Sequence, residues 1–103
     1  MILIADGGST KCDWAVVDCS AGTILHRFQS EGLNPYARTE EDILSTLTVV
    51  VAPQVDSYDL SAVHFYGAGV TPEKSSLLCT LIGKVISAET ITAQSDMECA
   101  ARA

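Results

Sequence analysis

The sequence predicts an α/β domain built on a mixed β-sheet, and three observations support that class. Three short apolar runs joined by tight connections open the chain, as in an antiparallel meander. Strand and helix patterns then alternate, which favours parallel strands joined by right-handed crossovers. The chain has 103 residues, of which 48% are hydrophobic and 18% charged, and this composition suits one small folded domain. The expected element order is β-β-β-α-β-α-β-α.

The first three strands are predicted from apolar runs that end in turn residues. The runs cover residues 1–5, 12–17 and 23–29. Residues 6–8 close the first run with an Asp-Gly-Gly sequence, and residues 19–22 separate the second run from the third. We therefore expect three consecutive antiparallel strands.

Two helices are predicted from capping residues and from apolar positions at helical spacing. Thr39 can cap a helix over residues 40–52, and Pro53 should end that helix. A second helix should begin after Thr71, run to about residue 82 and stop near Gly83. Both helices follow strands, so they are expected to cover the sheet.

The last part of the chain is expected to hold two more strands and a third helix. Residues 60–66 and 89–93 have strand patterns, and a glycine-rich turn at 67–69 closes the first of them. Residues 95–96 precede a helix that begins at Met97 and is still continuing at the last residue. Because a helix cut off after two turns leaves its end uncapped, we expect a piece of a longer protein.

Charge and cysteine content argue against several classes of function. Six Lys and Arg stand against thirteen Asp and Glu, a formal net charge of −7, so no basic stripe for nucleic acid is expected. The four cysteines lack C-x-x-C spacing, which predicts reduced, mostly buried thiols and no zinc or iron–sulfur site. No signal-like segment and no membrane-length apolar run is present, so the cytoplasm is the expected location.

Residues 6–11, between the first two strands, combine groups that can hold a phosphate. Glycine N–H groups can approach an anion closely, and hydroxyl and lysine side chains add donors and charge. Because carboxylates repel phosphates, Asp6 fits beside them only with Mg²⁺ or its waters in between. An ordinary Asp-Gly hairpin turn would contain the same residue types, so both interpretations are open at this point. The expected phosphate-binding residues are Gly7, Gly8, Ser9, Thr10 and Lys11.

Four motifs along the chain together resemble one family. Residues 6–11 resemble the first phosphate motif of the sugar kinase, Hsp70 and actin superfamily, and motifs at 32–35, 67–69 and 95–101 follow in order. This order resembles the BadF/BadG/BcrA/BcrD ATPase family and, within it, the N-acetylglucosamine kinase-like proteins. The resemblance implies two ribonuclease H-like domains of the actin-like ATPase fold, with ATP and a sugar in the cleft between them. Residues 1–103 would form an incomplete first domain, which alone should not be an active kinase.

The resemblance also implies a role for each motif. Residues 7–11 would contact the ATP phosphates, and Asp6 would hold Mg²⁺ through water. Asn34 would bind a sugar hydroxyl, and Asp96 would be the general base that accepts the proton of the attacking hydroxyl. The turn expected to line the sugar side of the cleft consists of Gly67, Ala68 and Gly69.

Local chemistry offers alternative explanations for several of these residues. Asn34 before a proline is common in ordinary loops, and Asp96 is a typical helix N-cap. His26 and His64 have no acidic partner at ligand spacing, so they are expected to be structural. Cys12 stands where the family often has threonine.

Three classes of function stay open. The favoured class is an ATP-dependent amino-sugar kinase with ATP and Mg²⁺ as cofactors. A BadF-type ATPase, coupling hydrolysis to conformational change or electron transfer, would need cluster-binding cysteines that are not recognisable here. A ribonuclease H-type nuclease would place Asp6 and Asp96 on two metal ions, which the acidic composition disfavours. The expected partners are a small sugar and the missing C-terminal domain, with no nucleic acid and no membrane, and a homodimer is left open.

Overall fold

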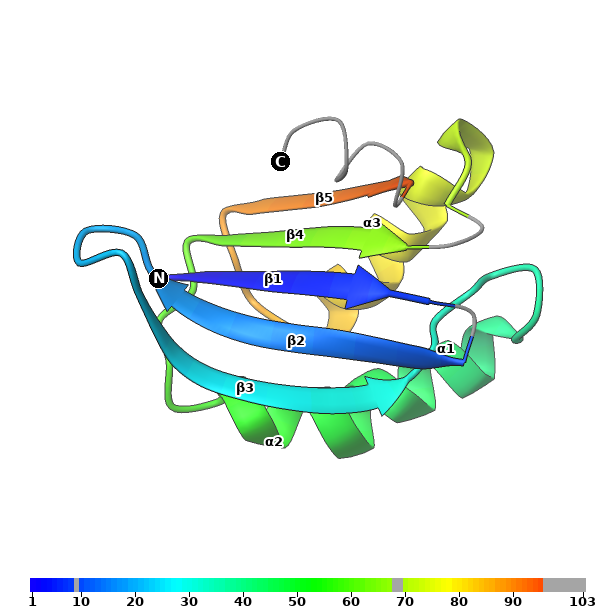
Figure 1. Cartoon of the computed structure of the whole chain (residues 1–103). Helices are drawn as coiled ribbons and strands as arrows, with labels where there is room; N and C mark the ends of the chain where they lie inside the picture. The colour runs from blue at the N-terminus through cyan, green and yellow to red at the C-terminus, as the bar shows by residue number, and fades with distance from the viewer. Residues whose placement is uncertain (9, 68–69, 96–103) are drawn as a thin grey trace.

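A five-stranded mixed sheet forms the centre of this computed structural model, which describes residues 1–8, 10–67 and 70–95 (Figure 1). The strands lie in the order β3-β2-β1-β4-β5. β1 pairs antiparallel with β2 and β2 with β3, whereas β1, β4 and β5 are parallel. The predicted mixed α/β sheet is therefore confirmed. The strands are β1 (Ile2–Gly7), β2 (Lys11–Asp18), β3 (Thr23–Glu31), β4 (Ala62–Gly67) and β5 (Thr90–Ser95).

The first helical segment begins as predicted but continues past its expected end. Thr39 caps it, because the Thr39 hydroxyl accepts a hydrogen bond from the Asp42 N–H at 3.2 Å. Pro53 was expected to end the helix, and that prediction is wrong. A π-helical turn, in which the Ala52 N–H donates to the Leu47 carbonyl, leaves Pro53 in the first turn of a new α-helix, where its missing N–H is tolerated. The segment consists of α1 (Glu40–Thr46), the π-helical η1 (Leu47–Val51) and α2 (Ala52–Val55).

The second long helix, α3 (Pro72–Val85), also extends beyond its predicted stop. Thr71 caps its beginning by accepting a hydrogen bond from the Lys74 N–H at 3.4 Å. Gly83 was expected to end it but lies inside the helix, so that prediction is wrong. A glycine in a helix costs only about 1 kcal/mol, and the fully buried Ile82 beside it holds the last turn against the core.

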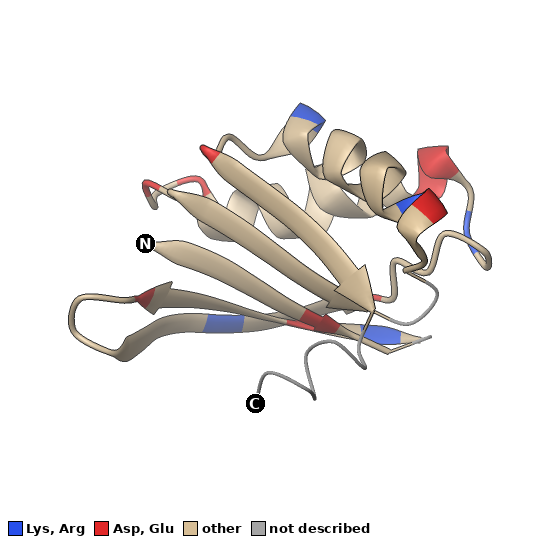
Figure 2. Ribbon diagram, turned by 90° about the horizontal axis from the view of Figure 1, so that it is seen from above, with Lys and Arg blue, Asp and Glu red and all other residues tan. Residues whose placement is uncertain are grey.

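The helices cover one face of the sheet, as the views in Figures 1 and 2 both show. The strand residues that point toward the helices are buried, and aromatic rings fill the centre of this layer. The Trp14 ring stacks on Phe28 at a centroid distance of 5.9 Å and lies 6.0 Å from Phe65. The largest fully buried side chains are Leu3, Trp14, Leu33, Ile43, Leu47, Phe65, Leu78, Leu81 and Ile82.

Charged and sulfur-containing side chains are arranged partly as predicted. Lysines and arginines are spread over strands, loops and helices of the described residues and form no stripe (Figure 2). Cys12 is buried and Cys79 half-buried, but Cys19 is exposed, so the prediction of mostly buried thiols is wrong for Cys19. The helix expected from Met97 lies outside the described residues. Within the described residues, no helix is long and apolar enough to cross a membrane.

Candidate functional site

The predicted site residues converge at one edge of the sheet, where β1, β4 and β5 reach their carboxyl ends (Figure 1). Gly7, Gly67 and Ser95 are successive register partners across this edge. Strand order also reverses here, because β2 and β3 lie on one side of β1, whereas β4 and β5 lie on the other. The carboxyl ends of strands at such a switch point are where open α/β sheets bind ligands.

The turn between β1 and β2 is the hairpin that the sequence predicts. The Gly8 N–H donates to the Lys11 carbonyl at 2.8 Å and closes the turn. Gly8, Thr10 and Lys11 are exposed at its tip. A strand follows the turn, so a bound anion would meet backbone N–H groups and side chains without the help of a helix dipole.

The glycines of this edge are present for different physical reasons. A Cβ atom on Gly67 would overlap the buried Phe65 ring, which therefore requires a glycine there. One on Gly7 would lie 3.2 Å from the same ring, a tight contact that the ring could relieve only by shifting slightly. Gly8 differs, because its φ is not positive and, among the described residues, the nearest atom to an added Cβ would be the Lys11 carbonyl oxygen at 3.6 Å.

Asp6 is exposed beside this hairpin and faces a second carboxylate that the sequence analysis did not single out. Its register partner on β2 is Asp13, and directly opposite residues of an antiparallel pair have Cβ atoms about 4.5–5.5 Å apart. Asp13 Oδ1 accepts a hydrogen bond from Gln29 Nε2 at 2.7 Å. Side chains alternate between the two faces of a strand, and the hairpin turn sets which residues of the two strands lie opposite each other. Together these rules could have predicted the pairing of Asp6 with Asp13.

Mg²⁺ is compatible with this arrangement but is not established by it. Within residues 1–8, 10–67 and 70–95, no group of three or more His, Cys, Asp or Glu side chains could hold a metal ion. Mg²⁺ commonly uses only one or two carboxylates, takes its other ligands from water and substrate phosphates, and so does not need such a group. Asp6, with Asp13 opposite, fits that pattern.

Asn34 lies in the loop of residues 32–38 that follows β3, and its side chain organises that loop. Asn34 Oδ1 accepts a hydrogen bond from the Tyr36 N–H at 2.9 Å, as turn chemistry predicts. The side-chain NH₂ has no hydrogen-bond acceptor among the described residues, so it is available to a ligand. Turn formation and ligand binding are therefore compatible at this residue.

Two hydrogen bonds tie this loop to the other segments of the site. The Gly32 N–H donates to the Thr10 carbonyl in the hairpin at 3.0 Å. The Tyr36 hydroxyl lies 3.1 Å from Thr71 Oγ1, at the beginning of α3. The structure thus joins the predicted phosphate hairpin, the Asn34 loop and the residues after β4 into one continuous edge.

Four predicted site residues lie outside the described residues: Ser9, Ala68, Gly69 and Asp96. Their proposed contacts, including the role of Asp96 as general base, stay predictions. The two histidines behave as expected, since His26 pairs with Gln54 at 2.7 Å and His64 with Thr92 at 2.8 Å.

Cys12 lies directly behind the hairpin, on the buried face of β2. Burial, together with the nearby Asp13 and Asp6 carboxylates, raises the pKa of its thiol to about 12. A thiol with so high a pKa is a poor nucleophile and a poor metal ligand at neutral pH. Cys12 is therefore a packing residue of the site.

Comparison with known proteins agrees with this geometry. No protein-family model and no curated protein sequence matches the chain. A solved structure described as a "putative N-acetylglucosamine kinase" from Porphyromonas gingivalis matches it with a TM-score of 0.79 and 36% sequence identity. The predicted resemblance to N-acetylglucosamine kinase-like proteins is confirmed. The match covers 94% of this chain and 35% of that chain, so this chain spans about a third of its relative.

The match also confirms the fold class. An α/β domain with a mixed sheet, of the actin-like ATPase type, is shared by this chain and the matched structure.

Proposed function

We propose that this chain is the first-domain part of a two-domain kinase that transfers the γ-phosphoryl group of ATP to an amino sugar. The likeness to a kinase supports the reaction class. The edge of the sheet supports the placement, because it brings together the phosphate hairpin, an exposed carboxylate pair and a loop whose Asn34 NH₂ has no acceptor among the described residues.

Gly8 is the observation that carries the proposal. Neither its backbone conformation nor the packing of the described residues requires a glycine there. A glycine without a structural reason, exposed at the tip of a hairpin, fits a position where a ligand must approach the backbone closely. ATP phosphates are ligands of that kind; neighbouring N–H groups and the Thr10 hydroxyl could donate hydrogen bonds to them, and Lys11 would neutralise part of their charge.

The remaining residues divide the chemistry of phosphoryl transfer among them. Mg²⁺, when bound, would neutralise charge on the phosphates, and Asp6 would hold it through water. The Asn34 amide and the turn at 67–69 would orient the sugar. Asp96 would accept the proton of the attacking hydroxyl. Alignment of the sugar hydroxyl with the γ-phosphorus atom of ATP supplies much of the rate enhancement in such reactions. Several loops must therefore hold fixed positions at one edge of the sheet.

The test uses the full-length protein and a pair of glycine variants. Wild-type enzyme should consume ATP only when an amino sugar such as N-acetylglucosamine is present, with one sugar phosphate formed per ATP. Gly8→Ala should lower kcat/KM for ATP by about tenfold or more while the melting temperature stays the same or rises slightly.

Gly83→Ala is the matched control, because it makes the same change at the far end of α3. It should stabilise the helix by about 0.5–1 kcal/mol and leave turnover unchanged. ATP hydrolysis that does not depend on a sugar would overturn the kinase proposal and indicate a BadF-type ATPase. Equal ATP kinetics in wild type and Gly8→Ala would show that the ATP phosphates do not bind at this hairpin.

A further inference from the structure

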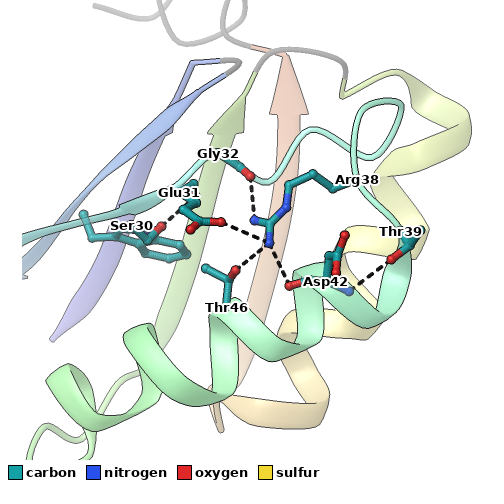
Figure 3. Close-up of polar contacts among 8 residues, drawn as sticks. Ser30, Glu31, Gly32, Arg38, Thr39, Asp42 and Thr46 are labelled. Carbon is teal, nitrogen blue, oxygen red and sulfur yellow. Dashed lines mark hydrogen bonds and ion pairs between the residues drawn. The ribbon is translucent and has the colours of Figure 1, made fainter.

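Arg38 occupies the end of the Asn34 loop, and its guanidinium points back between that loop and α1 (Figure 3). Nη1 donates to the Gly32 carbonyl at 2.9 Å. Nη2 donates to Thr46 Oγ1 at 2.8 Å and to the Asp42 carbonyl at 3.1 Å. The side chain is only 19% exposed, and the hydrogen bonds to Gly32 and Thr46 are partly buried, whereas the one to Asp42 is exposed. One side chain therefore fastens the start of the loop to α1.

Gly32 extends this connection to the phosphate hairpin. Its carbonyl accepts from Arg38, and its N–H donates to the Thr10 carbonyl at 3.0 Å. Gly32 is itself buried. Arg38 is thus linked through a single residue, Gly32, to the hairpin that is proposed to hold the ATP phosphates.

The backbone of Arg38 also takes part in the turn that presents Asn34. The Arg38 N–H donates to the Asn34 carbonyl at 3.0 Å, and the Ala37 N–H donates to the same oxygen at 3.1 Å. Together with the bond from the Tyr36 N–H to Asn34 Oδ1, these contacts fix the direction of the Asn34 amide.

Geometry, more than charge, makes this contact specific. Glu31 is the carboxylate paired with Arg38, at 3.4 Å, but it is 77% exposed, and an exposed ion pair contributes little. The acceptors on Gly32 and Thr46 need two donors at a fixed angle. A planar guanidinium provides them, whereas a lysine ammonium is a single point of charge.

We propose that Arg38 is a positioning residue for sugar recognition. It fixes the Asn34 loop against α1 and, through Gly32, against the hairpin, so that the sugar-binding and phosphate-binding groups keep one relative placement. Arg38 would touch neither substrate. The inference rests on the proposed kinase function, and its physical basis is that a hydrogen bond from Asn34 to the sugar weakens steeply when its donor leaves the required distance and angle.

The test compares Arg38→Lys and Arg38→Met with Glu31→Gln in the full-length protein. Both Arg38 variants should raise the KM for N-acetylglucosamine by about tenfold or more. The KM for ATP should change by less than about threefold, because the β1–β2 ladder still holds the hairpin. Glu31→Gln removes the exposed carboxylate but keeps the three hydrogen bonds, so the KM for N-acetylglucosamine should stay at the wild-type level.

Amide hydrogen exchange gives a measure that does not depend on turnover. In Arg38→Lys, the Gly32 and Tyr36 N–H groups should exchange at least about tenfold faster, while exchange in β1 stays unchanged. A wild-type enzyme without sugar-dependent turnover would overturn the proposed function and this role with it. An active wild type, with Arg38 variants that keep its sugar KM, would overturn the role of Arg38 alone. A lower melting temperature and lower kcat at constant sugar KM would also overturn it, since that pattern indicates a purely structural residue.

Discussion

Asn34 shows that the two explanations its sequence context allows do not exclude each other. Its amide oxygen is held by the Tyr36 N–H, which is ordinary turn chemistry. Because the oxygen is engaged in the turn, the proposed contact with the sugar would use the NH₂ group, which needs an acceptor on the ligand. A sugar hydroxyl oxygen or an acetamido carbonyl would meet that requirement.

Asn34→Asp separates the two functions of this side chain. Aspartate can still accept from the Tyr36 N–H, so the free energy of unfolding should change by less than about 0.5 kcal/mol. It cannot donate, so in the full-length protein the KM for the sugar should rise about 10- to 100-fold while the KM for ATP stays constant. Urea unfolding and steady-state kinetics measure the two effects. An unchanged sugar KM would exclude Asn34 from sugar binding.

The residues of the site differ in how far the sequence could predict them. The hairpin residues and Asn34 are found because short motifs place them at turns. Arg38 carries no such motif, since its partners Gly32, Asp42 and Thr46 are scattered over two elements and meet only in the folded chain. Residues that act through tertiary hydrogen bonds are therefore missed by a reading of local patterns.

Helix boundaries, too, could be predicted only where they depend on neighbouring residues in the sequence. Thr39 and Thr71 were predicted as caps and are confirmed, because capping depends on neighbouring residues only. Pro53 and Gly83 were predicted as stops, and both lie inside helices. A π-helical turn accommodates the proline, and packing of the last turn of α3 outweighs the glycine. Tertiary contacts decide where these helices end.

The paired strands β1 and β2 carry a local electrostatic cost that can be measured. Asp6 and Asp13 face each other, and like charges directly opposite on neighbouring strands destabilise a sheet by up to about 1 kcal/mol. Asp13→Asn should therefore raise the free energy of unfolding by several tenths to about 1 kcal/mol, since asparagine can still accept from Gln29. Urea titration at low ionic strength measures this.

Asp59→Asn provides the control for Asp13→Asn. It removes the same charge from an exposed residue outside the strands, so stability should change by less than about 0.5 kcal/mol. Added salt should reduce the difference between wild type and Asp13→Asn, because screening weakens the repulsion. Equal stability of wild type and Asp13→Asn at low salt would contradict the expected repulsion.

At the scale of the whole molecule, one layer of helices, one sheet and one functional edge account for the described residues. The strand order places β1 at the centre, so the hairpin after β1 lies beside the ends of β4 and β3. This arrangement was predictable as an alternation of strands and helices. The depth at which each side chain lies was not, and the cysteines are an example, because mostly buried thiols were expected, yet Cys12 is fully buried while Cys19 is exposed.

Burial of Cys12 makes the stability of the whole domain depend on alkaline pH. Its pKa is about 12 in the folded chain, whereas an exposed cysteine in the unfolded chain titrates near 8.5. Below about pH 8.5 both states keep the proton, and stability is fully present. Above that value the unfolded state loses a proton that the folded state retains. Stability should therefore fall by up to about 1.4 kcal/mol for each pH unit until the folded thiol also ionises.

Cys12→Thr tests this dependence, because threonine fits a strand and does not titrate in this range. Between pH 8 and pH 10, wild type should lose about 1–2 kcal/mol more of its free energy of unfolding than Cys12→Thr, as measured by urea unfolding under reducing conditions. The other cysteines, the lysines and the tyrosines are common to both proteins, so their titration cancels in the difference. Parallel pH profiles for the two proteins would mean that the Cys12 thiol is not held in its protonated form by the fold.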